Sequence, residues 1–569
     1  MASERARVDG DWHDIGYHTI LRSGDRPGIE DGAEGDEGTF GLMRDQNGAA
    51  VTDPEDGSDF VANSADFNSI LPVGDKLHMV THFESTPGGA YLTEIDQNAT
   101  TGELTALSTE HIDFSDWGGL WVPCAGSVTP WGTHLGGEEY PPEARGWTSA
   151  SSVEETGLAG TRVHMLKYFG FDTSDATALD MDAVRAAFAP YDYGWAWEFA
   201  LDSEGGRTTE KHYAMGRLSF ELAYVMPDEK TAYLTDDGAN VGLFMFVADE
   251  AGRLDAGTLY AMKWLQTSDE GAGEADINWV NLGHATNADI AALIDGGTTF
   301  EDIFETAEGL TEGDGDSATL TGECPEGFRP VNSGDSAFEC LKLKPNMEQA
   351  ASRLETRRYA AYLGATTELR KEEGVTFDPD SSRLFVAMSA IGRGMTDDDP
   401  TWDLGGPNDV RLEPNRCGAV YGLDVDSNAT VGSDYVAMNW YGIVEGVETT
   451  YPDDSPAAGN TCDIDGIASP DNVTFITGYN TLIIGEDTAA HQNDIIWELD
   501  LERDQLVRIQ TTPYGSETTS PYWYPNIGGY GYITSVVQHP YGESDQDKLE
   551  DPADKRAYVG VIGAFPAMD

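Results

Sequence analysis

The amino-acid sequence predicts an all-β fold built from repeated hairpins, and three observations lead to this prediction. One short unit recurs, in which an apolar strand is followed by a turn containing Pro, Asp or Gly and by a second apolar strand. Each copy begins with an acid or a cysteine. The copies are separated by long and irregular intervals. Hairpins that recur in this way are typical of the blades of a β-propeller, whose strands surround a central channel.

The clearest unit begins at Cys124, with a proline six positions later and Glu139 fifteen positions later. The same two spacings separate Glu221 from a proline and from Asp236. Further units begin at Asp66, Glu373 and Asp471. If equivalent positions of successive blades lie at equal radii, these first residues form a ring of carboxylates and one thiol at a mouth of the channel. The alternative is that matching spacings arise by chance, because acids are abundant in this chain.

The copies differ in their second strands. Glu486 stands fifteen positions after Asp471, whereas a methionine takes that place in the copy before it. The copy that begins at Asp66 has His82 in its second strand. Glu517 precedes the last predicted strand and is the candidate for a sixth member of the ring.

Composition limits what such a ring can do. The chain has 569 residues, with 101 acidic against 33 basic side chains and a net charge of −68. That charge repels nucleic acid and anionic membranes, so we expect neither as a partner. The basic residues are ten Lys and twenty-three Arg. An acidic, lysine-poor surface predicts adaptation to concentrated salt, where the Debye length is about 3 Å at 1 M. The alternative is an acidic secreted protein from a marine setting.

The five cysteines favour an oxidising compartment. Cys324 and Cys340 flank a loop rich in Gly, Pro and Ser, and Cys417 and Cys462 are placed to pair across blades, which leaves Cys124 alone. The alternative is five buried free thiols in a reducing compartment. No segment approaches the length of a membrane span, and no apolar leader follows the N-terminus. We therefore expect a soluble protein, either cytoplasmic or a mature exported form.

We expect a single propeller domain over residues 1–569, with helical and acidic insertions at about 141–210 and 265–365. Residues 1–60 are expected to form a turn-rich lead-in. Helices are expected at 178–188, 285–294 and 347–362. The second insertion ends just before Glu373 and would bring Arg370 and Lys371 to the rim of the ring. The alternative is that both are solvated charges at a helix exit.

Several motifs, in this order, resemble the PhoX-type alkaline phosphatases from about residue 60 to the end of the chain. They are Cys124-Ala-Gly, Thr129-Pro-Trp-Gly-Thr, Glu138-Glu139, Met215-Gly-Arg217, Glu221, Glu373-Gly-Val, Pro470-Asp471-Asn472 and Gln538-His539-Pro540. The resemblance implies a six-bladed propeller, export by a twin-arginine signal, and a calcium-dependent centre in which Fe³⁺ is held by glutamates and a cysteine thiolate. The family also has relatives that hydrolyse phosphotriesters.

On this resemblance, and on the preference of Fe³⁺ and Ca²⁺ for carboxylate oxygens, we assign candidate roles. The candidate iron ligands are Cys124, Glu221 and Glu373. The candidate ligands on the calcium side are Glu139, Asp471 and Glu486. Arg370 or Lys371 is expected to bind a phosphoryl oxygen. A second set of candidates comprises Asp66, His82, Asp236 and Glu517.

Three positions depart from the family pattern and concern the groups that would face substrate. Phe220 stands where the family has histidine before the acid, and Lys371 stands where it has arginine. The family's Asn-His-Glu of the first blade appears only as Thr81-His82-Phe83-Glu84. The departures leave the predicted metal ligands in place.

The predicted function is a secreted or periplasmic, metal-dependent alkaline phosphatase that acts on small phosphate monoesters, as a monomer. Phosphomonoester hydrolysis is among the slowest uncatalysed reactions, and metal ions in the ring would supply the positive charge that the substrate requires. One alternative is a phosphotriesterase or phosphodiesterase that uses the same cluster. The other is a non-enzymatic propeller stabilised by calcium.

Overall fold

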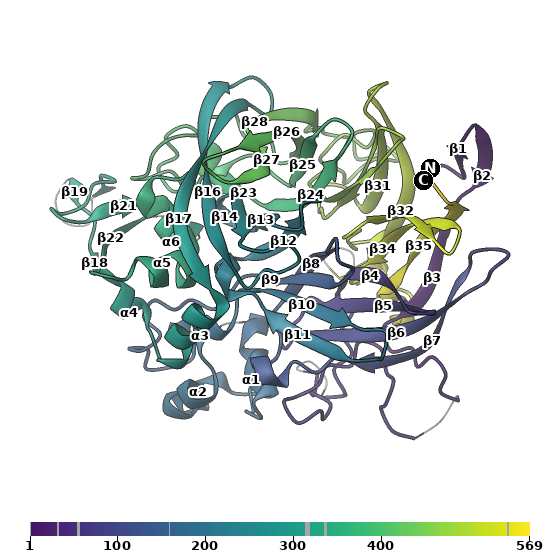
Figure 1. Ribbon diagram of the computed structural model, residues 1–569, viewed down its shortest axis with the longest axis horizontal. Coiled ribbons are helices and arrows are strands. Elements are labelled where there is room, and N and C mark those ends of the chain that lie inside the picture. Colours follow the sequence, from purple (N-terminus) through teal and green to yellow (C-terminus); the bar gives the residue numbers. More distant parts are fainter. Residues whose placement is uncertain are drawn as a thin grey trace.

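The computed structural model describes residues 2–30, 34–53, 57–158, 160–312, 319–334, 338–542 and 546–568. Within these residues the strands form six blades (Figure 1), and the predicted six-bladed propeller is confirmed. The innermost strands contact one another in cyclic order, from β4 (Ala65–Val73) through β8 (Pro123–Val128), β12 (Phe220–Val225), β24 (Glu372–Asp378) and β29 (Pro470–Ile476) to β33 (Tyr522–Ile527), whose blade contacts β4 again.

Each blade continues outward from its inner strand by antiparallel pairing. The first blade adds β5 (Lys76–Phe83), β6 (Gly89–Gln97) and β7 (Leu104–His111), and the second adds β9 (His134–Glu138), β10 (Ala196–Leu201) and β11 (Arg207–Lys211). The third adds β13 (Thr231–Asp236), β15 (Phe244–Ala248), β16 (Ala256–Ser268) and β17 (Glu274–Thr286). The fourth adds β25 (Arg383–Met388), β26 (Ala419–Asn428), β27 (Ser433–Ala437) and β28 (Asn439–Glu445). The fifth adds β30 (Thr481–Glu486), β31 (Asn493–Asp500) and β32 (Gln505–Tyr514).

The sixth blade closes the propeller with strands from both ends of the chain. It contains β33, β34 (Tyr530–Val537), β35 (Tyr558–Pro566) and, as its outer strand, β3 (Tyr17–Arg22). Tyr17 pairs with Ile562 and Arg22 with Tyr558. The two chain ends consequently lie side by side in Figure 1. Residues 1–60 are therefore more than the lead-in that we expected, because one of their strands completes the last blade. The hairpin of β1 (Arg5–Val8) and β2 (Asp11–Asp14) precedes that strand.

The third and fourth blades are joined into one sheet. β16 and β17 are both 13 residues long, so they project beyond the other strands of their blade. At the start of β17, Ala275 pairs with Trp440 of β28. Trp440 also packs edge-on against Trp264 of β16, with ring centroids 5.8 Å apart. The second insertion leaves the propeller at the opposite end of β17, after Thr286.

The first insertion lies between β9 and β10 and contains α1 (Met165–Tyr168) and α2 (Met181–Ala187). The helix expected at 178–188 is α2. The structure places β10 and β11 inside the range that we expected for this insertion, because they complete the second blade. An apolar cluster centred on Trp121 and Tyr193 holds the insertion against the propeller.

The second insertion contains helices and short strands. They are α3 (Asn287–Asp295), α4 (Phe300–Ile303), β18 (Phe304–Ala307), β19 (Thr311–Glu312), β20 (Thr319–Leu320), β21 (Arg329–Val331), β22 (Glu339–Leu343), α5 (Glu348–Leu354), α6 (Thr356–Leu363) and β23 (Leu369–Arg370). The helix expected at 285–294 is α3, which begins with a capping box at Thr286. The single helix expected at 347–362 is interrupted at Glu355. There the carbonyl of Arg353 accepts the Arg217 N–H at 2.9 Å instead of a helical N–H.

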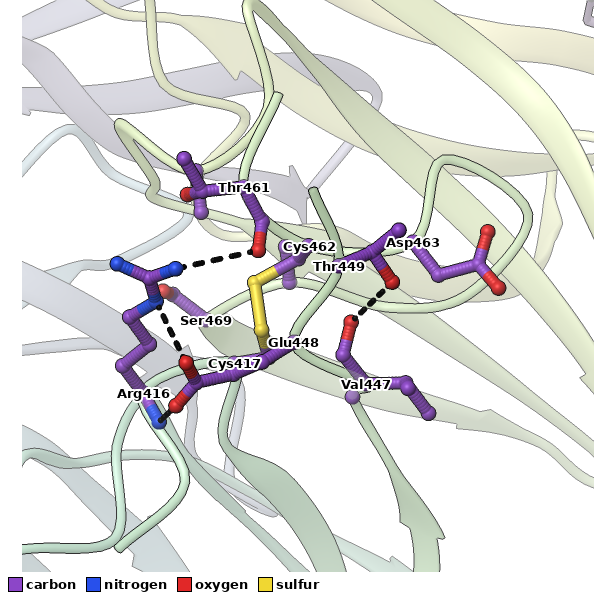
Figure 2. Close-up of a disulfide and its surroundings, with 12 residues drawn as sticks. Arg416, Cys417, Val447, Glu448, Thr449, Thr461, Cys462, Asp463 and Ser469 are labelled. Atoms are coloured by element: carbon purple, nitrogen blue, oxygen red, sulfur yellow. Dashed lines mark hydrogen bonds and ion pairs between the residues drawn. A yellow bond between two sulfur atoms is a disulfide. The ribbon is translucent and has the colours of Figure 1, made fainter. Parts of the chain in front are cut away.

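Both predicted disulfides are present, and Cys124 is the free cysteine. Cys324 bonds to Cys340, while Cys417 bonds to Cys462 and links the start of β26 to the segment that leads into the fifth blade. Figure 2 shows this second disulfide beside the Arg416–Glu448 ion pair. In the described part of the chain, no helix has the length and apolar character needed to cross a membrane.

Candidate metal centre

The structure brings the five predicted ring residues together at one mouth of the channel. Asp66, Cys124, Glu221, Glu373 and Asp471 are each the second residue of the innermost strand of their blade. In every one of these strands the pairing with the second strand shifts at or just after this residue. Such β-bulges leave a residue outside the regular ladder and redirect its side chain, which is common next to active sites. The repeated bulge explains why five strands direct the same position inward.

The ring residues and two neighbours form three groups whose potential ligand atoms lie within 4.8 Å of one another. These groups are Asp66–Glu84–Cys124, Cys124–Glu139–Glu221 and Glu221–Glu373–Asp471. Cys124 Sγ lies 3.2 Å from Asp66 Oδ2 and 3.2 Å from Glu221 Oε2. Because Cys124 and Glu221 each belong to two groups, the three groups are continuous and are suited to a cluster of ions with shared ligands.

Neutral side chains donate hydrogen bonds to three of the ring acids. Asn472 Nδ2 donates to Glu221 Oε1 at 3.2 Å, and Ser520 Oγ donates to Asp66 Oδ1 at 3.1 Å. Ser389 Oγ donates to Glu373 Oε1 at 2.8 Å. Asp471 Oδ1 is buried and has no hydrogen-bond partner among the described residues. Asp471 Oδ1 therefore faces the other carboxylates of its group without a hydrogen-bond donor.

The electrostatics of the ring favour positive charge beside the acids. Burial raises the pKa of Asp66 to about 7. Burial, together with repulsion from neighbouring carboxylates, raises the pKa of the other group members, which are Glu84, Cys124, Glu139, Glu221, Glu373 and Asp471. Without ions these groups retain protons, because buried like charges cannot all ionise. The carboxylate oxygens of this set suit hard cations. The single thiol adds a sulfur ligand that is compatible with iron.

Lys371 is the cation that touches the ring. Its Nζ lies 2.9 Å from Glu373 Oε1 and 3.4 Å from Asp237 Oδ2, and 29% of its side chain remains exposed. Although burial would lower it, these two carboxylates raise the pKa of Lys371 well above its usual range. Burial would raise the pKa of Asp237, but Lys371 lowers it to about 2. Tyr140 Oη also donates to Asp237.

Arg370, in contrast, forms no ion pair with a ring acid among the described residues. It belongs to β23, where it pairs with Ala239 of β14 (Ala239–Val241). Its Nη1 lies 3.2 Å from the point where a Cβ on Gly392 would stand. The structure therefore separates the two basic residues that we expected at the rim, with Lys371 at the acids and Arg370 beside the β25–β26 loop.

In the second strands, the side chain beside the ring belongs to the residue after the one that pairs with the start of the inner strand. In blades two to five, the residues opposite the start of the inner strand are Glu138, Asp236, Met388 and Glu486. The side chains beside the ring belong to the next residue in each case, which is Glu139, Asp237, Ser389 or Asp487. A shift by one residue moves a side chain to the opposite face of a strand. Of the second-strand acids that we expected, only Glu139 therefore lies in a group of potential ligands.

Asp236 and Glu486 have structural partners instead. The Arg357 guanidinium donates to both carboxylate oxygens of Asp236, at 2.6 and 2.5 Å. Glu486 accepts from Trp497 Nε1 at 2.7 Å and from the Ile495 amide at 3.0 Å, and it contacts His491 Nδ1 at 3.0 Å. Neither residue belongs to a group of potential ligands in the described part of the chain. Both carboxylates therefore already have partners within the protein.

His82 and Glu517 lie near the ring but not in its groups. His82 Nδ1 is 3.0 Å from His134 Nε2, in a buried pair between the first two blades. Burial lowers the pKa of His82 to about 3. Glu517 accepts from Gln538 Nε2 at 2.7 Å, and the same nitrogen donates to Glu84 Oε2 at 2.9 Å. In the sixth blade it is Ser520, three residues after the expected Glu517, that contacts a ring acid, with its Oγ 3.1 Å from Asp66 Oδ1.

Sequence reasoning missed Glu84 and Asp237 as site residues. Glu84 follows the end of β5, just as Glu139 follows the end of β9 and Asp237 the end of β13. Both residues could have been found by taking the first residue after the second strand of each hairpin. Fifteen-residue spacing locates that residue only in the second blade, where the hairpin is shorter.

Fold and site together define a class: a β-propeller whose channel mouth carries carboxylates and one thiol in groups that could hold metal ions. A family model described as "Alkaline phosphatase PhoX" matches residues 91–540. The match spans most of the 569 residues, so the chain belongs to the PhoX alkaline phosphatase family. It is a metal-dependent phosphatase, as the sequence predicted.

One solved structure supports the fold. The structure of Pseudomonas fluorescens PhoX in complex with vanadate, a transition state analogue, covers 99% of this chain and 97% of its own, with a TM-score of 0.60 and 16% identity. A putative 6-phosphogluconolactonase from Bacteroides uniformis covers 93% and 97%, but with a TM-score of 0.30 and 10% identity. No curated protein matches this chain.

Proposed function

We propose that this phosphatase releases inorganic phosphate from small phosphomonoesters, using Fe³⁺ and Ca²⁺ bound in the ring. The observation that carries the proposal is the continuous set of three ligand groups, in which six carboxylates and one thiol converge, all buried except the half-buried Glu84. With ions bound, the charge at the mouth becomes positive and suits a phosphate dianion, although the chain as a whole carries −68. The ions would supply charge stabilisation and activation of the attacking water.

We assign the ions by the softness of the ligands. The two groups that contain Cys124 would hold iron, because a thiolate binds Fe³⁺ more firmly than Ca²⁺. The group Glu221–Glu373–Asp471 offers only oxygen atoms, which Ca²⁺ prefers. Asp66, Glu84 and Glu139 would complete the set, and Glu486 is left out because its oxygens already accept other hydrogen bonds.

Lys371 would bind the phosphoryl group of the substrate. If Glu373 held an ion, its carboxylate would no longer depend on the ammonium of Lys371, which lies 2.9 Å away. Asp237 and Tyr140 would keep the Lys371 side chain at the mouth through the contacts that they already make. A lysine is a point charge with three donors, so it can follow a phosphoryl oxygen as charge develops during the reaction.

The vanadate complex of the Pseudomonas fluorescens enzyme supports this reading of the mouth, because that protein binds a transition state analogue. Export to the periplasm or medium is supported by the two disulfides. Adaptation to concentrated salt is supported by the excess of acids. We further propose that the protein acts as a monomer.

The proposal is tested by phosphate release from an aryl phosphate monoester and from the matching triester. The protein is assayed as purified, after chelation, and after chelation followed by Ca²⁺, and its iron and calcium contents are measured. We expect monoester hydrolysis that is lost with the metals, and iron in the purified protein. If the protein hydrolysed the triester but not the monoester, it would be a phosphotriesterase. If the metal-loaded protein hydrolysed neither ester, the non-enzymatic alternative would hold, in which calcium stabilises the propeller.

A further inference from the structure

Arg370 and Arg393 form a pair of cations beside the centre that the phosphatase mechanism does not use. Arg370 extends from β23 toward Gly392, and Arg393 is the next residue in the short helix Arg393–Met395 of the β25–β26 loop. The guanidinium of Arg393 stacks on Trp402 of the same loop, 4.4 Å from the ring centroid. Both arginines lie on the side of the propeller where the ring acids lie, because β23 leads directly into Lys371 and Glu373.

Neither guanidinium has a hydrogen-bond or ion-pair partner among residues 338–542 or in the rest of the described chain. In a chain with 101 acids and 33 basic residues, most basic side chains have an acid or a carbonyl within reach. Both arginines are only half-buried, and none of their nitrogens is shut away from solvent. The two cations also repel each other, since burial and Arg393 lower the pKa of Arg370, although Asp237 acts in the opposite direction. A bound anion would therefore stabilise the two guanidinium groups.

Two acids of the surrounding loop accept hydrogen bonds from other donors. Asp399 Oδ1 accepts from the amides of Thr401 and Trp402, at 2.8 and 2.9 Å. Asp397 accepts from Asn408 Nδ2 at 2.8 Å. The remaining loop acid with a shifted pKa is Asp403, for which burial raises the pKa to about 7. None of these carboxylates approaches either guanidinium closely enough to form an ion pair.

The corner that carries the two arginines is rigid. Asn240 Nδ2 of β14 donates to Asn332 Oδ1 at 2.9 Å, and Asn332 Nδ2 donates to the carbonyl of Trp402 at 2.6 Å. The helix Arg393–Met395 packs on both β14 and β23. Arg393 itself has a φ of 57°, a left-handed conformation that is unfavourable for a side chain of this size. Non-glycine residues are kept in that conformation mainly where the surroundings demand it, often at binding sites.

We propose that Arg370 and Arg393 form a second anion subsite, which binds a second phosphate on the leaving group of the substrate. The proposal rests on the proposed function, because it assigns the first phosphate to the metal centre and Lys371. Two guanidinium groups offer planar forks of donors that match phosphate oxygens, and a phosphate would relieve their mutual repulsion. The preferred substrates are therefore small organic bisphosphates rather than monophosphates of the same skeleton.

The subsite is tested by comparing kcat/KM for a sugar bisphosphate, the matching sugar monophosphate and an aryl phosphate, in holoenzyme at constant salt. We expect the wild type to favour the bisphosphate about tenfold or more, which is the worth of one charge-assisted hydrogen bond. Arg393→Gln should lower the bisphosphate-to-monophosphate ratio about tenfold, and Arg393→Lys should lower it less. The matched control is Arg383→Gln, on β25, whose guanidinium is paired with Asp424 at 3.5 Å. This control should leave the ratio as it is in the wild type.

A binding measurement separates failure of the subsite from failure of the proposed function. If the wild type hydrolyses no aryl phosphate, the proposed function is wrong, but calorimetry still compares the bisphosphate and monophosphate as ligands. Tighter binding of the bisphosphate that is lost in Arg393→Gln supports the subsite. Equal binding of the two compounds, or a preference that survives Arg393→Gln in a folded variant, overturns it.

Discussion

At the scale of single residues, neighbouring acids in this chain have opposite roles. Glu138 is fully buried and pairs with Lys211 at 2.8 Å, so its charge is neutralised inside the second blade. Glu139, the next residue, lies with Cys124 and Glu221 at the mouth. The same contrast separates Asp236, which Arg357 binds, from Asp237, which binds Lys371. One position along the strand therefore decides whether a carboxylate stabilises the fold or belongs to the site.

Cys124→Ser is expected to lose iron and phosphatase activity while the propeller remains folded. The substitution removes the thiolate but changes the side-chain volume little. Iron is measured by elemental analysis, and folding by the far-ultraviolet circular dichroism spectrum. Ser127→Ala is the matched control, because Ser127 is a buried residue of the same strand that bonds to the Ala223 carbonyl at 2.7 Å. A full iron content in Cys124→Ser would rule out Cys124 as a ligand.

Lys371→Met is expected to lower kcat/KM for an aryl phosphate monoester about 10- to 100-fold, the usual loss when a charged contact is removed. Lys371→Arg should retain most of the activity, because the charge remains and the arginine fork also suits phosphate. Lys263→Met is the matched control, since Lys263 forms an ion pair with Asp409 at 2.6 Å that plays no part in the ring. Equal losses in both methionine variants would mean that Lys371 acts only on stability.

The first residues of the repeat were predictable because equivalent blades place equivalent residues at equal radii. The second-strand residues were not, because the turns of the hairpins differ in length. The bulge adds one residue to the inner strand in both the second and the third blade, but the turn has five residues between Val128 and His134 and six between Val225 and Ala232. The spacing measured from Cys124 therefore falls one short in the third blade, and it selects Asp236 instead of Asp237. One additional turn residue moves the whole second strand by one position, and a fixed spacing does not allow for it.

At the scale of elements, three inner strands of the ring begin after a residue with left-handed backbone. These residues are Val122, Lys371 and Ser469, with φ values of 37°, 51° and 41°. The conformation is most unfavourable for the β-branched valine. In each case the ring residue follows two positions later. The turn and the bulge together direct the side chain toward the channel, so the geometry of the site is set by the backbone around it.

Gly374 shows how closely the inner strands approach one another. A Cβ at this position would collide with the backbone of Asn472 in the next blade. Gly374→Ala is expected to separate β24 from β29 and to disturb the Glu221–Glu373–Asp471 group. Calcium affinity, measured by titration after chelation, should fall about tenfold or more, as a strained ligand geometry would require. Gly432→Ala, at an open turn with a positive φ, is the control for general backbone strain.

The two disulfides are expected to contribute unequally to stability. The Cys417–Cys462 bond closes a sequence separation of 45 and the Cys324–Cys340 bond one of 16. Loop-closure entropy then gives the longer loop about 1 kcal/mol more stabilisation than the shorter one. The double variants Cys417→Ala/Cys462→Ala and Cys324→Ala/Cys340→Ala are compared by urea unfolding. A larger loss in the second variant would show that local packing outweighs loop entropy.

Pairing between distant parts of the chain marks the limit of prediction at this scale. Hairpins were predictable from alternation and turn residues, since their strands are neighbours in sequence. The pairing of β3 with β35 joins residues more than 500 positions apart, and nothing local in Tyr17–Arg22 indicates its partner. The break between α5 and α6 likewise depends on Arg217, which comes from a different part of the chain.

At the scale of the whole molecule, the charge of −68 is distributed over a surface that only concentrated salt can screen. The thermal midpoint is expected to rise between low salt and about 1 M KCl, because like-charge repulsion is screened over the Debye length. Calcium is kept at a constant saturating concentration, since ligand binding alone also stabilises the folded state. A midpoint that is flat or falls with KCl would contradict adaptation to salt.

Removal of the metals is expected to make stability depend on pH. Burial raises the pKa of Asp66 to about 7, and the other ring acids shift in the same direction. In the unfolded chain these acids ionise near pH 4. The metal-free folded state therefore holds protons that the unfolded state has released, and its stability falls as the pH rises from about 4 to 7. Bound cations replace those protons and remove the dependence.

The measurement is the thermal midpoint of chelated and metal-loaded protein between pH 5 and 8, at one KCl concentration. The chelated protein should be most stable near pH 5 and lose stability toward pH 8, whereas the loaded protein should change much less. Surface acids do not account for the difference, because they are ionised throughout this range and are the same in both samples. Asp66→Asn should reduce the slope of the chelated protein, because the amide does not titrate. Parallel curves for the two samples would mean that the ring acids are not the groups that the metals neutralise.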